Sequence, residues 1–189
     1  MTRSEAYQIL TAYITDPKLL IHSLAAEVTM KALYKRLNPV YYDSIMEEKW
    51  GITGLLHDAD YELTRDNPQF HGILLSQKEV NIPIDIAYAI KAHNYRENNI
   101  MPQSQMDWAM ATCDQLTGLI TACALVQPDK TLASVTPDFV LEKIQDNLFT
   151  PPVAREPILL CEEKLGIPLQ EFIIIALLAI QSIHADLKL

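Results

Sequence analysis

The amino-acid sequence predicts an all-α fold. Glycine is scarce, with 5 residues in 189, and apolar residues recur mostly at spacings of three and four, which is the period of an amphipathic helix. Serine, threonine and aspartate residues stand where apolar runs begin, as helix N-caps do, and prolines follow some of them. The sequence contains no convincing strand pattern. We therefore expect one helical domain over residues 1–189.

The first two expected helices lie within residues 4–37. Ser4 can cap a short first helix. Asp16 and Pro17 combine an N-cap with a first-turn proline and open a long helix. This helix ends before Asn38–Pro39, because the residue before a proline disfavours the helical conformation.

The next three expected helices carry most of the histidines. Asp43 begins a helix over residues 44–59, which holds a His–Asp pair near its C-terminal end. Asn67–Pro68 marks a loop, and a short helix after it carries His71. Pro83 opens a further helix, which runs to about the next histidine.

The rest of the chain continues the helical pattern. Ser104 and Asp107 resemble a capping box and begin a helix to about Leu125. A polar segment at residues 127–134 is expected to be a loop, and Thr136–Pro137 restarts a helix.

The final segments form an expected helical appendage over about residues 135–189. Thr150–Pro151–Pro152 breaks the preceding helix. A helix over residues 158–165 ends at Gly166, which suits the left-handed turn after a helix. Pro168 then opens an apolar last helix.

Composition excludes several functional classes. The net charge of −9 argues against a duplex nucleic-acid binder, which usually needs a basic face. The longest apolar run, Phe172–Ile180, is too short to span a bilayer, and the N-terminus has no apolar signal core. Three cysteines without a CxxC pattern indicate free thiols, so we expect a cytoplasmic protein without a membrane partner.

Four of the five histidines occur in an order that suggests a metal site. The residues in this order are His22, His57–Asp58, His71, His93 and Asp114. Their neighbours are largely apolar, and an unpaired carboxylate is costly to bury there. Imidazole suits divalent manganese, iron, cobalt, nickel or zinc, and carboxylates suit the harder of these ions. Neighbouring side chains on a helix diverge by about 100°, so Asp58 is a candidate to bridge two ions.

This order of residues resembles the HD superfamily of metal-dependent phosphohydrolases. The runs that carry the resemblance are HSLAAEVTMKAL, GLLHDADYE, FHGILLSQ, IAYAIKAHN and ATCDQLTGLI, all within about residues 5–125. The later runs ACALVQPDKTLASV and CEEKLGIPLQEF resemble a bacterial branch of predicted HD-superfamily hydrolases. The resemblance implies an HD-type helical bundle, with its metal-bearing part at residues 5–125 and a C-terminal helical extension.

The resemblance also implies a ligand set and a reaction. The implied ligands are four core residues, His22, His57, Asp58 and Asp114, and the two further histidines of binuclear members, His71 and His93. One or two divalent ions would activate water to attack a nucleotide or another small phosphoester. Asp60 stands where the family usually has glycine, and Tyr61 where a lysine often meets phosphate, so the substrate does not carry over.

Residues near the ligands are candidates for catalysis and substrate binding. The catalytic candidates are Asp58, as bridging ligand, and Asp60 and Glu62, as residues that orient water or act as the general base. The candidates for contacts with phosphate are Lys91, Arg65, Arg96 and Thr117. Alternatively, Asp60, Glu62 and the three cations are solvated surface residues, and His71 and His93 contact substrate or cap helices.

Three functions remain open at the level of sequence. The favoured one is a phosphohydrolase, acting on monoesters or diesters. The second is an HD-fold di-iron oxygenase, because a few proteins with a similar ligand set use oxygen. The third is a non-catalytic module that binds a metal or a nucleotide.

Overall fold

The computed structural model describes residues 1–146, 148–150 and 153–187. Every regular element within these ranges is helical, which confirms the all-α class. The α-helices are α1 (Arg3–Tyr13), α2 (Pro17–Leu37), α3 (Ser44–Leu56), α4 (Tyr61–Thr64), α5 (Ile73–Lys78), α6 (Ile84–His93), α7 (Tyr95–Asn98), α8 (Gln105–Leu125), α9 (Pro137–Gln145), α10 (Arg155–Leu159), α11 (Cys161–Leu165), α12 (Leu169–Gln181) and α13 (His184–Leu187). Two 3-10 turns are η1 (Pro68–Phe70) and η2 (Leu132–Ser134). In the described ranges, no helix combines the length and the apolar content needed to cross a membrane.

Most expected helix starts are confirmed by hydrogen bonds. The carboxylates of Asp16 and Asp43 each accept from the backbone N–H two residues further on. Ser104 and Asp107 form the reciprocal pair of a capping box at the start of α8. Thr136 caps α9 through its side chain. Local capping chemistry thus sets these boundaries, as the sequence indicates.

The structure corrects three expected elements near the N-terminal half. Thr2, rather than Ser4, caps α1, because its hydroxyl and the Glu5 carboxylate form a capping box. Helix α3 ends at Leu56, so the His–Asp pair lies in the turn after it. His71 lies in the turn between η1 and α5 rather than on a helix.

The C-terminal expectations are also revised. The helix expected over residues 158–165 is two short helices, α10 and α11, of which the first begins earlier, at Arg155. Gly166 has the left-handed conformation expected of it, with φ 67°. The polar segment 127–134 contains the single turn η2. The break expected at Pro151–Pro152 lies outside the described residues.

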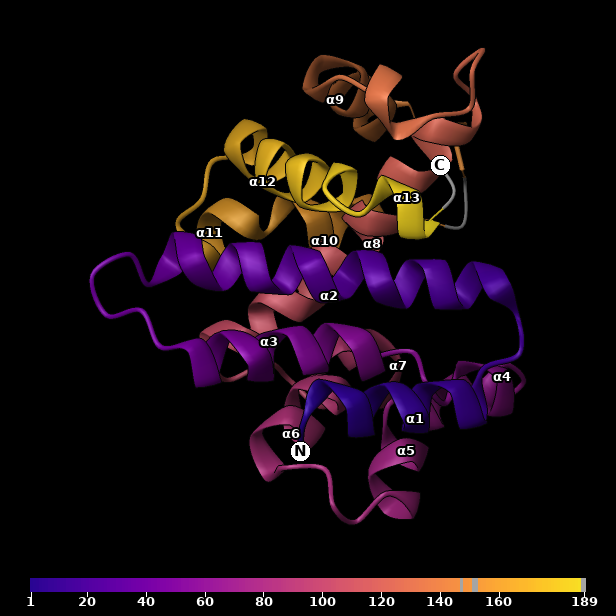
Figure 1. Ribbon diagram of the computed structural model, residues 1–189, viewed down its shortest axis with the longest axis vertical. Helices are drawn as coiled ribbons and strands as arrows, with labels where there is room; N and C mark the ends of the chain where they lie inside the picture. The colour runs from indigo at the N-terminus through magenta and orange to yellow at the C-terminus, as the bar shows by residue number, and fades with distance from the viewer. Residues whose placement is uncertain (147, 151–152, 188–189) are drawn as a thin grey trace.

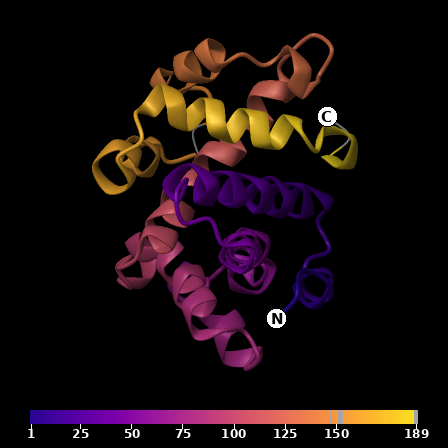
Figure 2. The same cartoon turned by 60° about the vertical axis from the view of Figure 1, so that its left-hand side comes forward.

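Helix α2 lies at the centre of the molecule. It packs against α3 on one side and α12 on the other, and it also contacts α8. Figure 1 shows α2 between α12 above and α3 and α1 below, and Figure 2 shows the same stacking from another side. One apolar core fills the space between α2, α8 and α12, and a second lies among α1, α3 and α6. Helices α2 and α3 lie between the two cores, and α8 packs beside them.

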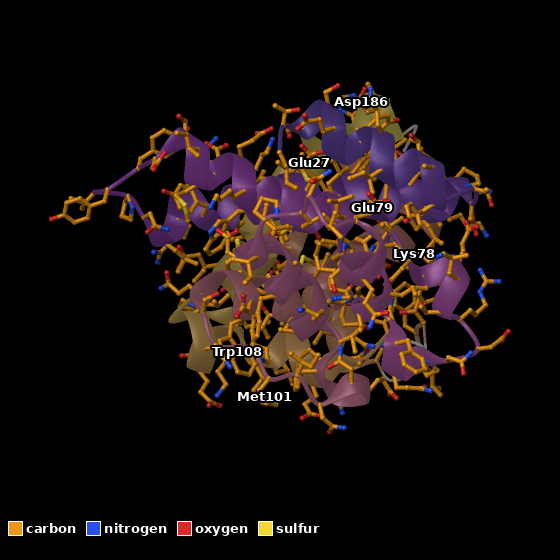
Figure 3. All side chains as sticks on the ribbon, turned by 90° about the horizontal axis from the view of Figure 1, so that it is seen from below. Glu27, Lys78, Glu79, Met101, Trp108 and Asp186 are labelled. Carbon is orange, nitrogen blue, oxygen red and sulfur yellow. The ribbon has the colours of Figure 1, made fainter. Side chains whose placement is uncertain are left out.

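An ion pair between exposed Arg3 and buried Glu27 joins α1 to α2. Glu27 on α2 is 3% exposed and accepts two hydrogen bonds from the Arg3 guanidinium, at 2.6 and 2.9 Å. Lys31 donates a further bond to the same carboxylate at 3.1 Å. Glu27 is labelled in Figure 3. These bonds provide the partners that a buried carboxylate requires.

The close approach of α3 to α2 depends on Gly54. A Cβ atom at this position would lie 2.5 Å from the backbone carbonyl oxygen of Ala26 on α2. Only glycine therefore fits at this crossing. Gly54 precedes His57 by less than one helical turn, and Ala26 follows His22 by about one turn. The glycine thus brings the two helices together where their histidines must meet.

Candidate metal centre

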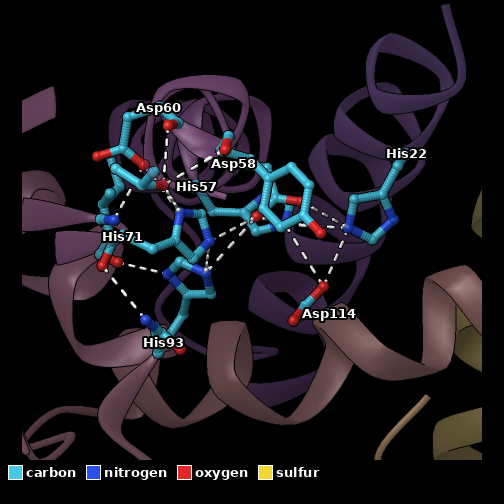
Figure 4. A network of polar contacts seen from close by, with 12 residues as sticks. His22, His57, Asp58, Asp60, His71, His93 and Asp114 are labelled. Carbon is cyan, nitrogen blue, oxygen red and sulfur yellow. Dashed lines mark hydrogen bonds and ion pairs between the residues drawn. The ribbon is translucent and has the colours of Figure 1, made fainter. Parts of the chain in front are cut away.

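Six side chains converge from five parts of the fold. His22 comes from α2, and His57 and Asp58 come from the turn after α3. His71 lies in the η1–α5 turn, His93 at the end of α6, and Asp114 in the middle of α8. Figure 4 shows these side chains directed toward one another. The structure therefore brings together all six residues that the sequence order singled out.

The first group of polar atoms surrounds Nε2 of His22. This nitrogen lies 3.1 Å from Nε2 of His57 and 3.0 Å from Oδ1 of Asp114. Oδ2 of Asp58 is 3.4 Å away. Nitrogen ligands sit about 2.0–2.1 Å from ions such as zinc, so two on one ion are roughly 3–3.4 Å apart. The spacing of the two histidines fits a shared ion.

The second group surrounds the other oxygen of Asp58. Oδ1 lies 3.0 Å from Nε2 of His71 and 3.7 Å from Nε2 of His93. The two histidine nitrogens are 3.1 Å apart. Asp58 therefore belongs to both groups, each of which can hold a metal ion. A carboxylate placed in this way is suited to bridge two ions.

In three of the histidines, Nδ1 forms a hydrogen bond to an acceptor oxygen. The ring of His57 donates from Nδ1 to the carbonyl oxygen of Gly54 at 2.7 Å, and that of His93 to the carbonyl oxygen of Ile90 at 2.5 Å. Nδ1 of His71 lies 2.8 Å from a carboxylate oxygen of Asp60. A carbonyl or carboxylate oxygen accepts only, so the proton of each neutral ring is on Nδ1.

His22 follows the same arrangement through a hydroxyl group. The hydroxyl of Thr117 donates to the backbone carbonyl of Asp114 at 2.7 Å, and its oxygen lies 3.3 Å from Nδ1 of His22. This oxygen accepts from the His22 ring. All four neutral imidazoles then direct the lone pair of Nε2 into the site. Hydrogen bonds that fix the outer nitrogen in this way are typical of histidines that bind metals.

The electrostatics of the site call for positive charge. Burial opposes ionisation of Asp58 and Asp114, but the neighbouring histidines outweigh it and hold both pKa values below the ordinary range. Burial likewise disfavours the charge on His57 and His71, but the carboxylates prevail and raise their pKa values to about 9 and about 10. Burial lowers the pKa of His93. Without metal, protons on His57 and His71 balance the negative charge of the carboxylates. Bound metal ions would take the place of these protons.

Asp60 and Glu62, the expected catalytic carboxylates, are both engaged in hydrogen bonds within the protein. Asp60 has no exposed surface, and it accepts hydrogen bonds from His71 and from the backbone N–H groups of Gly72 and Leu75. It orients His71 from behind. Glu62 turns the other way and accepts bonds from the segment before α2, at residues 15–16. Neither carboxylate is among the residues that line the pocket, so their expected catalytic roles stay predictions.

The four expected phosphate contacts divide into two pairs. Arg65 and Arg96 line a pocket of about 640 Å³ that opens onto Asp58 and Asp114. Lys91 and Thr117 are not among its lining residues, so the pocket gives their expected phosphate contacts no support. Thr117 is buried behind His22, and its hydroxyl is occupied by the contacts described above.

Gln115 is a site residue that the sequence interpretation missed. Its side-chain amide donates to Oδ2 of Asp114 at 2.8 Å, and its carbonyl accepts from the backbone N–H of Ala154 at 2.8 Å. The first contact holds Oδ2 of Asp114, while Oδ1 of the same carboxylate faces His22. Its adjacency to Asp114 was the one available signal, but adjacency gives no direction for a side chain.

Comparisons with known proteins leave the site to be interpreted from its own chemistry. No protein-family model matches the chain, and no curated protein or solved structure does so either. The function is therefore inferred from the convergence of the six side chains and from the pocket above them.

Proposed function

We propose that this chain is a metal-dependent phosphohydrolase of the HD type, acting on a nucleotide or another small phosphoester. The observation that carries the proposal is the sharing of Asp58 between two groups of imidazole nitrogens whose lone pairs converge. Paired ions bridged by a carboxylate are a common means of cleaving phosphate esters. The pocket above them, with two arginines, supports an anionic substrate.

The proposal assigns a role to each ligand. His22, His57 and Asp114 would hold a first ion, His71 and His93 would hold a second, and Asp58 would serve both. Such ions, when bound, stabilise negative charge on phosphate and make a water molecule more acidic, with a pKa near 7 in favourable cases. Because their pKa values are held low, Asp58 and Asp114 remain anionic at neutral pH and are available as ligands.

Other residues of the chain prepare the site for this chemistry. Asp60 fixes the ring of His71, and Gln115 fixes one oxygen of Asp114, so that the ligands need little reorganisation. The guanidinium of Arg65 lies 5.8 Å from the ring centre of Tyr61, on the lining of the pocket. In this position it offsets charge on a bound phosphate.

The two alternatives share the same ligands and differ in what the protein does. An HD-fold di-iron oxygenase would consume oxygen with its substrate. A non-catalytic module would be stabilised by a metal or nucleotide without turning it over. An assay of ester hydrolysis, combined with oxygen uptake and thermal stability, separates all three.

The test is hydrolysis of phosphate esters by purified protein supplied in turn with manganese, iron, cobalt, nickel or zinc. We expect release of phosphate or alcohol that needs the metal and is lost in His57→Ala and Asp58→Ala. His184→Ala is the matched control, because His184 is exposed and outside the site. Oxygen uptake, or thermal stabilisation without turnover across a panel of nucleotides and simple esters, would contradict a hydrolase.

A further inference from the structure

The lining of the pocket over the metal ligands is chemically mixed. It includes the aromatic ring of Tyr61 and the guanidinium of Arg65, from α4 and its C-terminal end. Its apolar side is formed by Ala111 and Gly118 of α8, next to the polar Gln115, and by residues 153, 154 and 157, which are valine, alanine and proline. The carboxylates of the metal site lie at the same pocket. A ligand there therefore meets the ligand carboxylates at one end and an apolar surface beside it.

The apolar side is built on a single face of α8. Ala111, Asp114 and Gly118 follow at spacings of three and four, which places them in one row along the helix. Helix α10 packs on α8, and Ala154, just before α10, bonds to Gln115 of α8, so the three apolar lining residues of this segment stand near this row. Asp114 lies in the middle of the row, and the apolar surface therefore begins directly beside a metal ligand.

Gly118 has no structural reason to be glycine. It lies inside the 21-residue helix α8, its φ is not in the left-handed region, and a Cβ added to it would meet no atom within 4 Å. A glycine inside a helix is less stable than alanine. Since neither packing nor backbone conformation requires it, the missing side chain leaves open space in the pocket. That space lies one helical turn from Asp114.

The wall at residues 153–157 is fixed relative to the metal ligands. Through Gln115, the backbone N–H of Ala154 is joined to Oδ2 of Asp114. On the other flank, Arg96 of α7 pairs with Glu156 of α10 at 2.8 Å. The bond to Gln115 therefore positions Ala154 relative to Asp114, and the exposed Arg96–Glu156 pair adds a weaker contact beside it.

The charge of the pocket limits the number of phosphates. Among the described residues, Arg65 and Arg96 are the cationic side chains on its lining, and Arg96 already has Glu156 as a partner. Glu97 adds a negative charge to the same lining. A chain of phosphates, with several charges beyond the ions, would lack partners here.

We propose that the ligand of this pocket is an ester of one phosphate with a compact, carbon-rich alcohol, and that Gly118 and Ala154 set the size of that alcohol. This inference rests on the proposed function for the placement of the phosphate at the metal ligands. The alcohol lies along α8 against the wall at residues 153–157. The specificity-determining part of the site is therefore partly supplied by the C-terminal appendage.

The experiment measures binding of two phosphonates that cannot be hydrolysed as esters. Benzylphosphonate and methylphosphonate are titrated into manganese-loaded protein by calorimetry. We expect benzylphosphonate to bind at least about tenfold more tightly, since its ring fills the apolar side. Gly118→Ala and Ala154→Leu should remove most of this preference and leave methylphosphonate binding within about threefold. Ala12→Leu, at an exposed position of α1 away from the pocket, should retain it.

A second measurement separates blocked space from damaged folding. Gly118→Ala should raise the melting temperature by about 2–4 °C, because alanine favours the helix and meets no neighbour. Equal affinity of the wild-type protein for the two phosphonates, or an undiminished preference in both pocket variants, would overturn the inference. Tighter binding of inorganic triphosphate than of benzylphosphonate would also overturn it.

Failure of the ligand class and failure of the proposed hydrolase activity give different results. A preference that disappears in the two pocket variants, in a protein that hydrolyses no ester, would support the ligand class and contradict the hydrolase. Ester hydrolysis with no effect of Gly118→Ala or Ala154→Leu on the choice of alcohol would support the hydrolase and overturn the inference.

Discussion

Asp58 and Asp60 are two residues apart and have different tasks. Asp58 presents Oδ2 to His22 and Oδ1 to both His57 and His71. Asp60 is buried behind His71 and holds its Nδ1. The first is placed to contact ions, and the second is placed to orient a ligand. A carboxylate behind a metal-binding histidine fixes the ring and raises its basicity.

Replacing Asp60 should weaken the second ion selectively. In Asp60→Asn, the negative charge behind His71 is lost, and the new amide group faces the backbone N–H of Leu75 instead of accepting from it. We expect the affinity for the second ion to fall about 10–100-fold while the first ion is retained. Calorimetric titration with manganese measures both affinities.

Glu62→Gln is the matched control for this variant, since Glu62 bonds to residues 15–16 and not to a ligand. Its ion affinities should equal those of the wild type. Equal second-ion affinity in Asp60→Asn and Glu62→Gln would contradict the positioning role of Asp60.

The raised pKa values of His57 and His71 make the metal-free protein sensitive to alkaline pH. A folded-state pKa of about 9 or about 10, above the ordinary value of 6.5, means that the folded chain holds these protons more tightly than the unfolded chain. The resulting stability is fully present below about pH 6.5 and is lost as pH rises through about 9 to 10. Melting temperatures of the metal-free protein should therefore fall over this interval.

Bound ions should reverse this pH dependence. Ions and protons compete for His57 and His71, so metal binding at pH 7 should release about two protons per chain. Titration of the unbuffered protein with manganese measures the release. A metal-free melting temperature that is constant or rises from pH 7 to 10, or binding without proton release, would contradict the assignment.

At the scale of elements, the crossing of α2 and α3 determines whether the histidines meet. The approach is limited by Gly54, whose missing Cβ leaves room for the carbonyl of Ala26. Capping at Asp16 and Asp43 fixes where the two helices begin. The relative position of the histidines on α2 and after α3 therefore depends on the contact at Gly54 and on where each helix begins.

Gly54→Ala should destabilise the protein and disrupt the metal site together. The added methyl group would lie 2.5 Å from a backbone oxygen, so α3 must move away from α2. We expect a loss of about 1–3 kcal/mol in the free energy of unfolding, as for other overpacked positions, and weaker binding of the first ion. Urea denaturation and metal titration measure the two effects, and Gly118→Ala, which has open space, is the control. Unchanged stability of Gly54→Ala would contradict the close crossing.

At the scale of the whole molecule, the N-terminal and C-terminal parts of the chain both contribute to one pocket. The part before Leu125 supplies all six candidate ligands, and the later part supplies the pocket-lining residues Val153, Ala154 and Pro157. The central position of α2, between α3 and α12, brings these two parts together. The pocket is therefore a property of the complete arrangement, with no single helix sufficient to form it.

Local chemistry explains which features the sequence could predict. The caps at Asp16, Asp43 and Ser104 act within one helical turn, so they can be identified from neighbours alone. The convergence of the six candidate ligands could be predicted because their residue types and order form a set. The direction of Asp60 and the wall at Ala154 were not, because they depend on which elements pack together far along the chain.

The central claim is that two groups of side chains, joined by Asp58, hold two metal ions. The most direct measurement is the metal content per chain of protein purified without chelator, by elemental analysis combined with native mass spectrometry. We predict two divalent transition-metal ions per chain in the wild type and in His184→Ala, with one lost in His71→Ala and both weakened in Asp58→Ala. A wild-type chain that retains one ion or none after dialysis against added manganese, iron, cobalt, nickel or zinc would contradict the binuclear centre.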